Sequence, residues 1–182
     1  MKNIFLSSLI AITFFSCSQK PTIKVMKTAY VDTSILMDDY KEAKDIATKY
    51  KAKSEEMDKQ LQSDALNLKK DKDYFQKNAQ TKGDAWAQQH YAELQKRDQQ
   101  LQYTQQQMLQ QLQKESSIET ESLVKKVKQF IKEYGKQKGY AYIYGTGETA
   151  SVLYAQDQFD ITKELTKLLN EKYKNTAKAS NK

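Results

Sequence analysis

The sequence has little cysteine, proline, histidine or glycine: one, one, one and five residues among 182. A lone cysteine, Cys17, cannot form an internal disulfide, so a disulfide-stapled fold is excluded. The single histidine, His90, has no second histidine with which to share a metal ion. No nucleophile and base pair stands out among the many carboxylates. We therefore expect no catalytic residue, no metal site and no bound cofactor.

The N-terminus has the form of a secretory signal peptide. Met1-Lys2-Asn3 is a short basic start, and the run from Ile4 to Phe15 is apolar but too short for the about 20 residues of a membrane span. Phe14-Phe15-Ser16-Cys17 resembles a bacterial lipobox, with Phe14 in the place where leucine is usual. We expect residues 1–16 to be removed, Cys17 to be lipidated, and residues 17–24 to form the linker to a membrane.

The charge balance is basic. The chain has a formal charge of +7, which falls to +6 when the signal peptide takes away Lys2. Such a balance favours anionic partners, here anionic lipid or lipopolysaccharide, and a secreted chain makes nucleic acid the least expected of them. Mean hydropathy is strongly negative, which argues for an elongated molecule instead of one thick core.

A long helical region dominates the middle of the chain. Apolar positions recur at spacings of three and four from Leu36 to Phe75 and again from Ala87 to Tyr134, which is the heptad pattern of a coiled coil. Polar residues interrupt the first seam, and an extra step of four after Leu112 is a stutter in the second. We favour Leu61, Leu68, Leu94 and Leu101 as residues that pack the two seams together.

Gly83 separates the two seams. A glycine there can end one helix in a left-handed conformation, and Asp84 can cap the next. The sequence therefore predicts an antiparallel helical hairpin over residues 40–138. One unbroken helix in a parallel dimer is the alternative, and Gly83 argues against it.

The flanks of the hairpin have strand-like patterns. We expect strands over 23–32, 140–144 and 150–155, the last two forming a hairpin, and then a helix capped by Asp160 that runs through Tyr173. Residues 25–39 and 139–174 would form one small head, and residues 175–182 a flexible tail. So small a head needs self-association for stability. Candidate head and oligomer residues are Tyr30, Val31, Tyr142, Ile143, Tyr144, Val152 and Leu153.

Gly145-Thr146-Gly147-Glu148-Thr149-Ala150 fits a dinucleotide-binding fingerprint as text. That motif needs a helix directly after it and an acidic residue about 20 positions on. A strand-like segment follows here, and Asn170 lies near the place of the acid, so a hairpin turn is the better interpretation.

The two ends of the chain resemble the Skp/OmpH family. The resemblance lies in Lys27 to Leu36 followed by Tyr40, in Tyr142-Ile143-Tyr144-Gly145, in Val152-Leu153-Tyr154, in Asp160 to Glu164, and in Leu169-Asn170. With the helical insert it covers most of residues 25–173. It implies an α+β fold, mostly α, in which a small β head carries a long antiparallel coiled-coil hairpin, and three chains form a jellyfish-shaped homotrimer.

The family resemblance also implies a function. Its members hold unfolded outer-membrane proteins in the periplasm without ATP and prevent their aggregation. A lipid anchor departs from the soluble members and places this chain at a membrane, with the periplasmic face of the outer membrane as the expected site. A lipid-anchored coiled-coil spacer of the cell envelope is the alternative function.

Client contact calls for many weak, adaptable apolar contacts, which flexible methionine and aromatic side chains supply. The candidates are Met57, Tyr74, Phe75, Trp86, Tyr91, Tyr103 and Met108, of which Tyr74, Trp86 and Tyr103 lie off the seams. Lysines form a basic arm tip that can attract an acidic client or an anionic surface: Lys69, Lys70, Lys72, Lys77 and Lys82.

Overall fold

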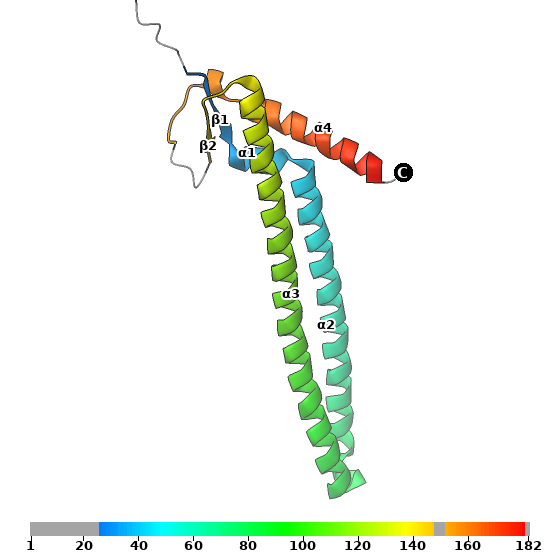
Figure 1. The fold of residues 1–182 in the computed structure, drawn as a ribbon. Helices are drawn as coiled ribbons and strands as arrows, with labels where there is room; N and C mark the ends of the chain where they lie inside the picture. The colour runs from blue at the N-terminus through cyan, green and yellow to red at the C-terminus, as the bar shows by residue number, and fades with distance from the viewer. Residues whose placement is uncertain (1–25, 148–151, 181–182) are drawn as a thin grey trace, which may run out of the picture.

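A computed structural model describes residues 26–147 and 152–180. In chain order the elements are β1 (Thr28–Asp32), α1 (Thr33–Asp39), α2 (Lys41–Lys82), α3 (Asp84–Lys138), β2 (Tyr142–Thr146), the short 3-10 helix η1 (Asp157–Phe159) and α4 (Thr162–Ser180). Helices α2 and α3 form a long arm that leaves a small head, and α4 crosses the root of the arm (Figure 1). The predicted mostly helical fold, with a long antiparallel hairpin on a small strand-containing head, is confirmed.

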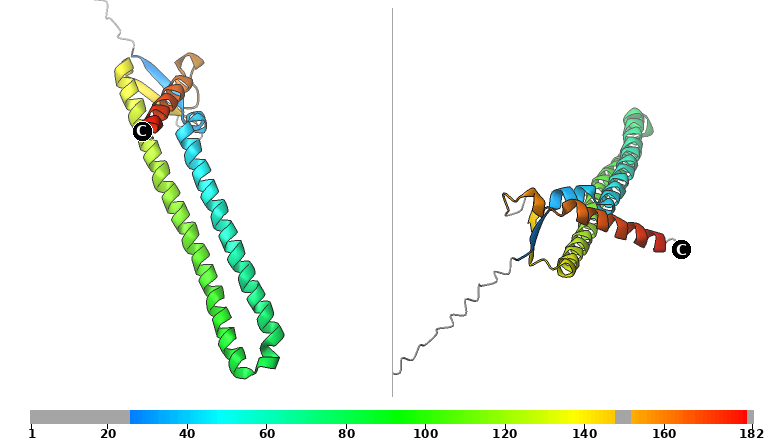
Figure 2. Two further views of the ribbon diagram at one scale, coloured as in Figure 1. Left: turned by 90° about the vertical axis from the view of Figure 1, so that its right-hand side faces the viewer. Right: turned by 90° about the horizontal axis from the view of Figure 1, so that it is seen from above.

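The arm is an antiparallel hairpin that turns at Gly83. This glycine has φ 84°, a backbone conformation that side chains rarely adopt, and no other atom lies within 4 Å of a Cβ built on it. The prediction that Asp84 caps the second helix is wrong, because Gly83 itself is the N-cap and Asp84 is already helical. At about 1.5 Å per residue the two helices are about 60 and 80 Å long, and they run side by side in both further views (Figure 2).

The two predicted seams face each other with few exceptions. Leu68 and Leu94 are buried, and most other seam positions are partly buried. Ala47, Tyr91 and Gln105 are exposed, contrary to the heptad assignment, and the neighbouring Ile46 and Thr104 turn inward instead of Ala47 and Gln105. The polar seam residue Asp71 accepts a hydrogen bond of 2.6 Å from Arg97 across the hairpin.

The head contains a two-stranded parallel sheet. β1 pairs with β2 in the register Thr28 with Tyr142 through Asp32 with Thr146, and the whole arm is the crossover that parallel strands require. The expected hairpin between 140–144 and 150–155 is wrong, because residues 152–155 form no strand. Tyr30 of β1 also forms an isolated parallel bridge with Asp160.

Helix α4 is longer than its apolar pattern predicted. Residues 175–180, which the sequence assigned to a flexible tail over 175–182, continue this helix. The carboxylate of Asp160 accepts from the Thr162 backbone N–H, as expected of a residue that begins a helix, and the Thr162 hydroxyl accepts from the Asp32 backbone N–H over 2.8 Å. Asp32 in turn caps α1 by accepting from the Ser34 backbone N–H. This chain of bonds fixes the start of α4 against the end of β1.

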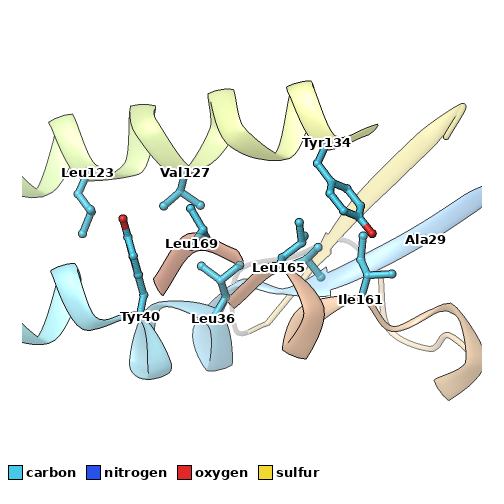
Figure 3. Packing of buried hydrophobic residues seen from close by; sticks show 10 residues of the cluster. Ala29, Leu36, Tyr40, Leu123, Val127, Tyr134, Ile161, Leu165 and Leu169 are labelled. Carbon is cyan, nitrogen blue, oxygen red and sulfur yellow. The ribbon is translucent and has the colours of Figure 1, made fainter. Parts of the chain in front are cut away.

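One hydrophobic core joins the head to the root of the arm (Figure 3). Leu165 of α4 is fully buried, and the surrounding side chains come from both the head and the arm: Ala29, Val31, Leu36, Tyr40, Leu123, Val127, Tyr134, Ile161 and Leu169. Gly135 lets β2 approach α3, because a Cβ at that position would lie 3.1 Å from the Ile143 side chain. The root of the arm is therefore structurally part of the head.

Candidate functional site

Aromatic rings cluster at the tip of the arm. The Trp86 indole stacks on Phe75 across the hairpin, with centroids 5.9 Å apart, and on His90 of its own helix at 4.1 Å. Tyr74 meets the edge of Trp86 at 6.3 Å, and Tyr91 tilts against Phe75 at 6.2 Å. The sequence places Trp86 off the seams as a candidate contact residue, and in the structure it is partly buried in this cluster.

An open groove of about 440 Å³ lies beside the cluster. Phe75, Tyr91 and Leu94 supply its apolar surface, and Lys72 and Asp98 form an ion pair of 2.6 Å at its rim. Tyr91 is 55% exposed, although its heptad position predicted a packed ring. The groove is thus shallow, apolar at its base and polar at its edge.

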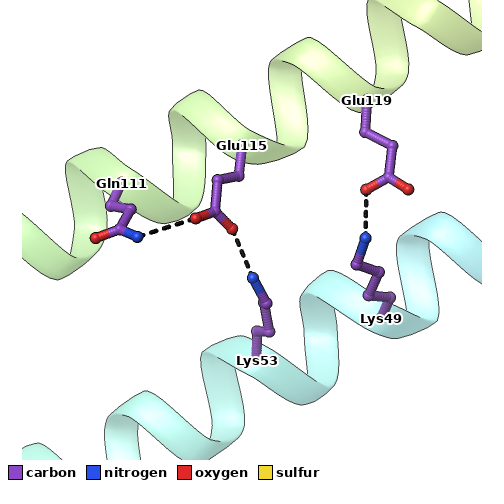
Figure 4. A network of polar contacts seen from close by, with 5 residues as sticks. All are labelled: Lys49, Lys53, Gln111, Glu115 and Glu119. Carbon is purple, nitrogen blue, oxygen red and sulfur yellow. Dashed lines mark hydrogen bonds and ion pairs between the residues drawn. The ribbon is translucent and has the colours of Figure 1, made fainter.

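Met57 and Met108 meet at a second groove, of about 320 Å³, halfway along the arm. Charged residues border it toward the head, where Lys53 pairs with Glu115 at 2.5 Å and Lys49 pairs with Glu119 at 2.7 Å (Figure 4). The lysine hydrogen bonds lower the pKa of both glutamates, and Gln111 contributes at Glu115 while Tyr50 contributes at Glu119.

Tyr103 does not join either groove. It is 58% exposed on α3, and within the described residues it has no aromatic partner. The structure divides the seven candidate contact residues into groups. Tyr74, Phe75, Trp86 and Tyr91 lie together at the tip, and Met57 lies with Met108 nearer the head. The sequence does not predict these two groups, because which side chains of α2 and α3 lie side by side depends on the register of the hairpin.

The lysines of the tip are less uniformly available than the sequence indicated. Lys72 is held by Asp98, and the Lys82 ammonium lies over the rings of Trp86 at 5.4 Å and Tyr74 at 5.7 Å. Lys69, Lys70 and Lys77 are exposed. Between Leu66 and Asp98 seven basic residues face five acidic ones, so the net surplus at the tip is small.

A larger basic surplus lies at the head end of the arm. Between Glu121 and Lys138, α3 carries six lysines and two glutamates, and α4 carries five lysines and two glutamates. Four of the α3 lysines are exposed and spaced by three or four residues, so they share one helix face on the side away from the core: Lys125, Lys128, Lys132 and Lys136. We call this face the α3 lysine stripe. The spacing of these lysines is visible in the sequence, but only the fold shows that they lie on the side of α3 away from the core.

The head exposes apolar side chains on and beside β2. Tyr142 and Tyr144 are stacked with centroids 5.8 Å apart and are each about half exposed, while Leu153 is 98% and Tyr154 82% exposed. Tyr30 and Val152 line an open groove between these residues and β1. We call the exposed side chains Tyr142, Tyr144, Leu153 and Tyr154 the head apolar face. Of the candidate head and oligomer residues, Val31 is buried in the core at 1% exposure, and Ile143 is partly buried against that core.

Other chemistry is not visible in the residues that the structure describes. They include no cluster of three or more histidine, cysteine, aspartate or glutamate side chains able to hold a metal ion. Within residues 26–147 and 152–180 no helix is both long and apolar enough to span a bilayer. Downstream of Gly147, the described residues 152–156 form no helix, so the structural context of a dinucleotide fingerprint is missing there. Cys17 lies outside the described residues.

The fold is that of a small α/β head that carries a long antiparallel helical arm with shallow grooves on it. The sequence matches the model of the outer membrane protein (OmpH-like) family over residues 27–169. The chain belongs to the OmpH-like family, and the resemblance drawn from its two ends is confirmed.

A solved structure shares the fold. It is that of a proposed outer membrane chaperone (OmpH-like) from Caulobacter crescentus CB15, with a TM-score of 0.75, 12% sequence identity, and coverage of 81% of this chain and 86% of that chain. No curated protein matches the sequence.

Proposed function

We propose that the protein is a chaperone of the cell envelope that binds unfolded outer-membrane proteins without ATP and prevents their aggregation. The observation that carries the proposal is the arm itself, on which two shallow grooves place methionine and aromatic side chains beside charged rims. Many weak contacts of this kind suit a partner without fixed shape, and binding the unfolded state opposes its aggregation. Membership of the OmpH-like family and the fold shared with a proposed outer membrane chaperone support it.

The grooves match the chemistry of unfolded β-barrel strands. Such strands alternate apolar and polar side chains, so an extended client segment can place apolar groups on Phe75 or Met108 and polar groups at the ion-paired rims. Methionine adapts to side chains of different shape, which a chaperone with many clients requires. No step in this binding calls for catalysis.

Self-association through the head completes the proposal. The head apolar face includes Leu153 at 98% and Tyr154 at 82% exposure, and side chains this apolar on so small a head favour burial against another copy. We propose a homotrimer, in which three heads associate through this face and three arms surround the client. Lone arms would offer the same grooves, but they would not enclose a client.

A lipid anchor at Cys17 would hold this assembly at a membrane, for which we propose the periplasmic face of the outer membrane. The chain enters the head beside the end of α3, where the Lys27 ammonium donates to the Lys138 carbonyl over 3.1 Å. The ten residues from Cys17 to Met26 reach at most about 35 Å. The α3 lysine stripe begins at the same end of α3, so anionic lipid or lipopolysaccharide headgroups are its proposed partners.

The proposal is tested by removing the free part of the arm. Because Tyr40, Leu123, Val127 and Tyr134 belong to the head core, a deletion of the whole region 40–134 would also damage the head. Residues 51–117 should instead be replaced by a short glycine-serine linker. The shortened protein should keep its oligomeric state by sedimentation and fail to form a complex with an unfolded outer-membrane protein. Complex formation at the full-length level would place the client site on the head and refute the arm as the binding element.

The alternative is a lipid-anchored coiled-coil spacer that connects two layers of the envelope. A spacer requires a defined partner at the tip, and its binding should depend on one surface. The distribution of apolar grooves along the arm favours the chaperone, because a spacer has no use for the Met57 and Met108 groove in its middle. Binding of several unrelated unfolded β-barrel proteins by the purified protein distinguishes the two.

A further inference from the structure

The arm leaves the head through a single extended residue. Tyr40, with φ −75° and ψ 121°, separates α1 from α2 without a glycine or proline. Its backbone N–H donates to the Leu36 carbonyl over 2.9 Å and completes α1, and its carbonyl accepts from the Lys44 N–H over 3.1 Å and begins α2. The direction of α2 relative to α1 therefore depends on the two backbone torsions of one residue.

The side-chain amide of Asn170 on α4 bonds to the backbone on both sides of this residue. Its Oδ1 accepts from the Lys41 N–H over 2.8 Å, which satisfies a donor that a helix start leaves without an intrahelical partner. Its Nδ2 donates to the Asp39 carbonyl over 3.2 Å. One amide thus joins the last turn of α1 to the first turn of α2.

Tyr173, one helical turn along α4, adds a second connection. Its ring packs edge-on against Tyr40 with centroids 6.2 Å apart, and its hydroxyl donates to Asp45 of α2 over 2.9 Å. Tyr40 is 4% exposed and donates through its hydroxyl to Glu42, which pairs with Lys126 of α3 at 2.7 Å. The connections from α4 therefore reach both helices of the arm.

We propose that Asn170 is a positioning residue that fixes the angle between the arm and the head, and that this angle determines how well the arms hold a client. The inference rests on the proposed function for its last step only. Without the amide, no described side chain of α4 bonds to the backbone on both sides of Tyr40, and the joint is restrained by ring packing and by the Tyr173–Asp45 hydrogen bond. A small rotation there displaces the tip of an arm about 60 Å long by many ångströms. An open groove between α4 and the arm root, lined by Phe130, Leu169 and Tyr173, leaves room for the rotation.

The variants that test it are Asn170→Ala, which removes both bonds, and Asn170→Asp, which keeps an acceptor for the Lys41 N–H. Asn175→Ala is the matched control, because it makes the same change on the exposed surface of the same helix. All are made in the mature protein with Cys17→Ser. Hydrogen exchange is measured over residues 38–46, and the distance between spin labels at Lys163 and Lys77 is measured in oligomers diluted with unlabelled protein.

Asn170→Ala should raise exchange at the start of α2 about fivefold, the size expected from the loss of one hydrogen bond, and should broaden the label distance distribution. Asn170→Asp should restore exchange protection, and Asn175→Ala should match the wild type. Unchanged exchange and distances in Asn170→Ala would overturn the inference. So would an equal rise in exchange across the whole head, which would mean general unfolding.

Client protection is then compared for the same variants. Asn170→Ala should protect an unfolded β-barrel protein less well than Asn175→Ala at equal concentration. Equal protection despite a broadened distance distribution would reduce Asn170 to a structural residue and refute the functional step. If the wild-type protein itself protects no client, the proposed function fails, whereas the exchange and distance results still decide whether Asn170 positions the arm.

Discussion

Trp86 of α3 stacks on Phe75 of α2 across the hairpin turn, with ring centroids 5.9 Å apart and ring planes inclined by 18°. The pair lies close to Gly83, where the chain turns from α2 into α3. Stacked aromatic pairs contribute about 0.5–1.5 kcal/mol beyond their buried area. This contact therefore holds the free end of the arm closed.

Replacing Trp86 by alanine should loosen the tip and leave the head unchanged. Hydrogen exchange over residues 75–92 should increase, while exchange over the head core should stay at the wild-type level. Tyr103→Ala is the control, since Tyr103 is 58% exposed and makes no ring contact in the described structure. If the Trp86→Ala variant exchanges at the tip at the same rate as the wild type, the ring cluster does not hold the tip closed.

Acid should weaken the arm through Glu115 and Glu119. Their pKa values are lowered by hydrogen bonds from Lys53 and Lys49, so the folded state favours the ionised carboxylates more than the unfolded state does. The stabilisation is present above the ordinary glutamate pKa of about 4.3 and is lost as pH falls through the lowered folded values. Helicity followed by circular dichroism during heating should therefore fall at lower temperature below about pH 4.

The matched variant for this prediction is Glu115→Gln with Glu119→Gln. It should be less stable than the wild type at neutral pH, and the difference should shrink as the wild-type carboxylates become protonated. A constant difference from pH 7 to pH 3 would show that these ion pairs do not contribute to the acid sensitivity of the arm.

The head apolar face should control assembly. Replacing Leu153 and Tyr154 by lysine places charge on side chains that are 98% and 82% exposed in the single chain, so the fold of the protomer should persist. Sedimentation should show a shift from trimer to monomer. Leu66→Lys, on an arm residue that is 53% exposed, is the control and should leave the trimer intact. A trimer that survives both head substitutions would place the interface elsewhere.

The α3 lysine stripe should bind anionic lipid. The unlipidated protein should associate with vesicles that contain phosphatidylglycerol and not with neutral vesicles, and added salt should weaken the association. Each lysine near such a surface contributes about 1 kcal/mol, so glutamine at Lys125, Lys128, Lys132 and Lys136 should abolish most of the binding. The same change at Lys69, Lys70, Lys77 and Lys82 is the charge-matched control. Equal loss in both variants would show a response to net charge and not to the stripe.

The sequence predicted the parts of the fold that depend on local chemistry. Three- and four-residue spacings gave the arm helices, and Gly83 located their turn because few other residues tolerate its backbone conformation. Local sequence patterns do not predict which strands pair with each other. Tyr142 to Thr146 pairs with β1, more than 100 residues earlier, and nothing in either segment distinguishes this parallel partner from an adjacent hairpin strand.

Side-chain roles were predicted least well where two distant segments meet. Leu169-Asn170 is part of the family resemblance, but nothing in the sequence indicates a contact for Asn170, and only the fold brings its amide to the joint at Tyr40. Trp86 is off the heptad seam, yet the open end of the hairpin lets it fold over Phe75. The sequence predicts Val31 as a head or oligomer residue without deciding between the two, and the structure buries it in the core of its own chain.

The most direct measurement of the proposed function is light scattering from an outer-membrane β-barrel protein diluted out of urea, with and without the mature protein carrying Cys17→Ser. The account predicts that aggregation is suppressed without ATP at about one trimer per client, and that the variant lacking residues 51–117 suppresses it much less. No suppression by a full-length protein shown to be helical and trimeric would contradict the chaperone function and favour the envelope spacer.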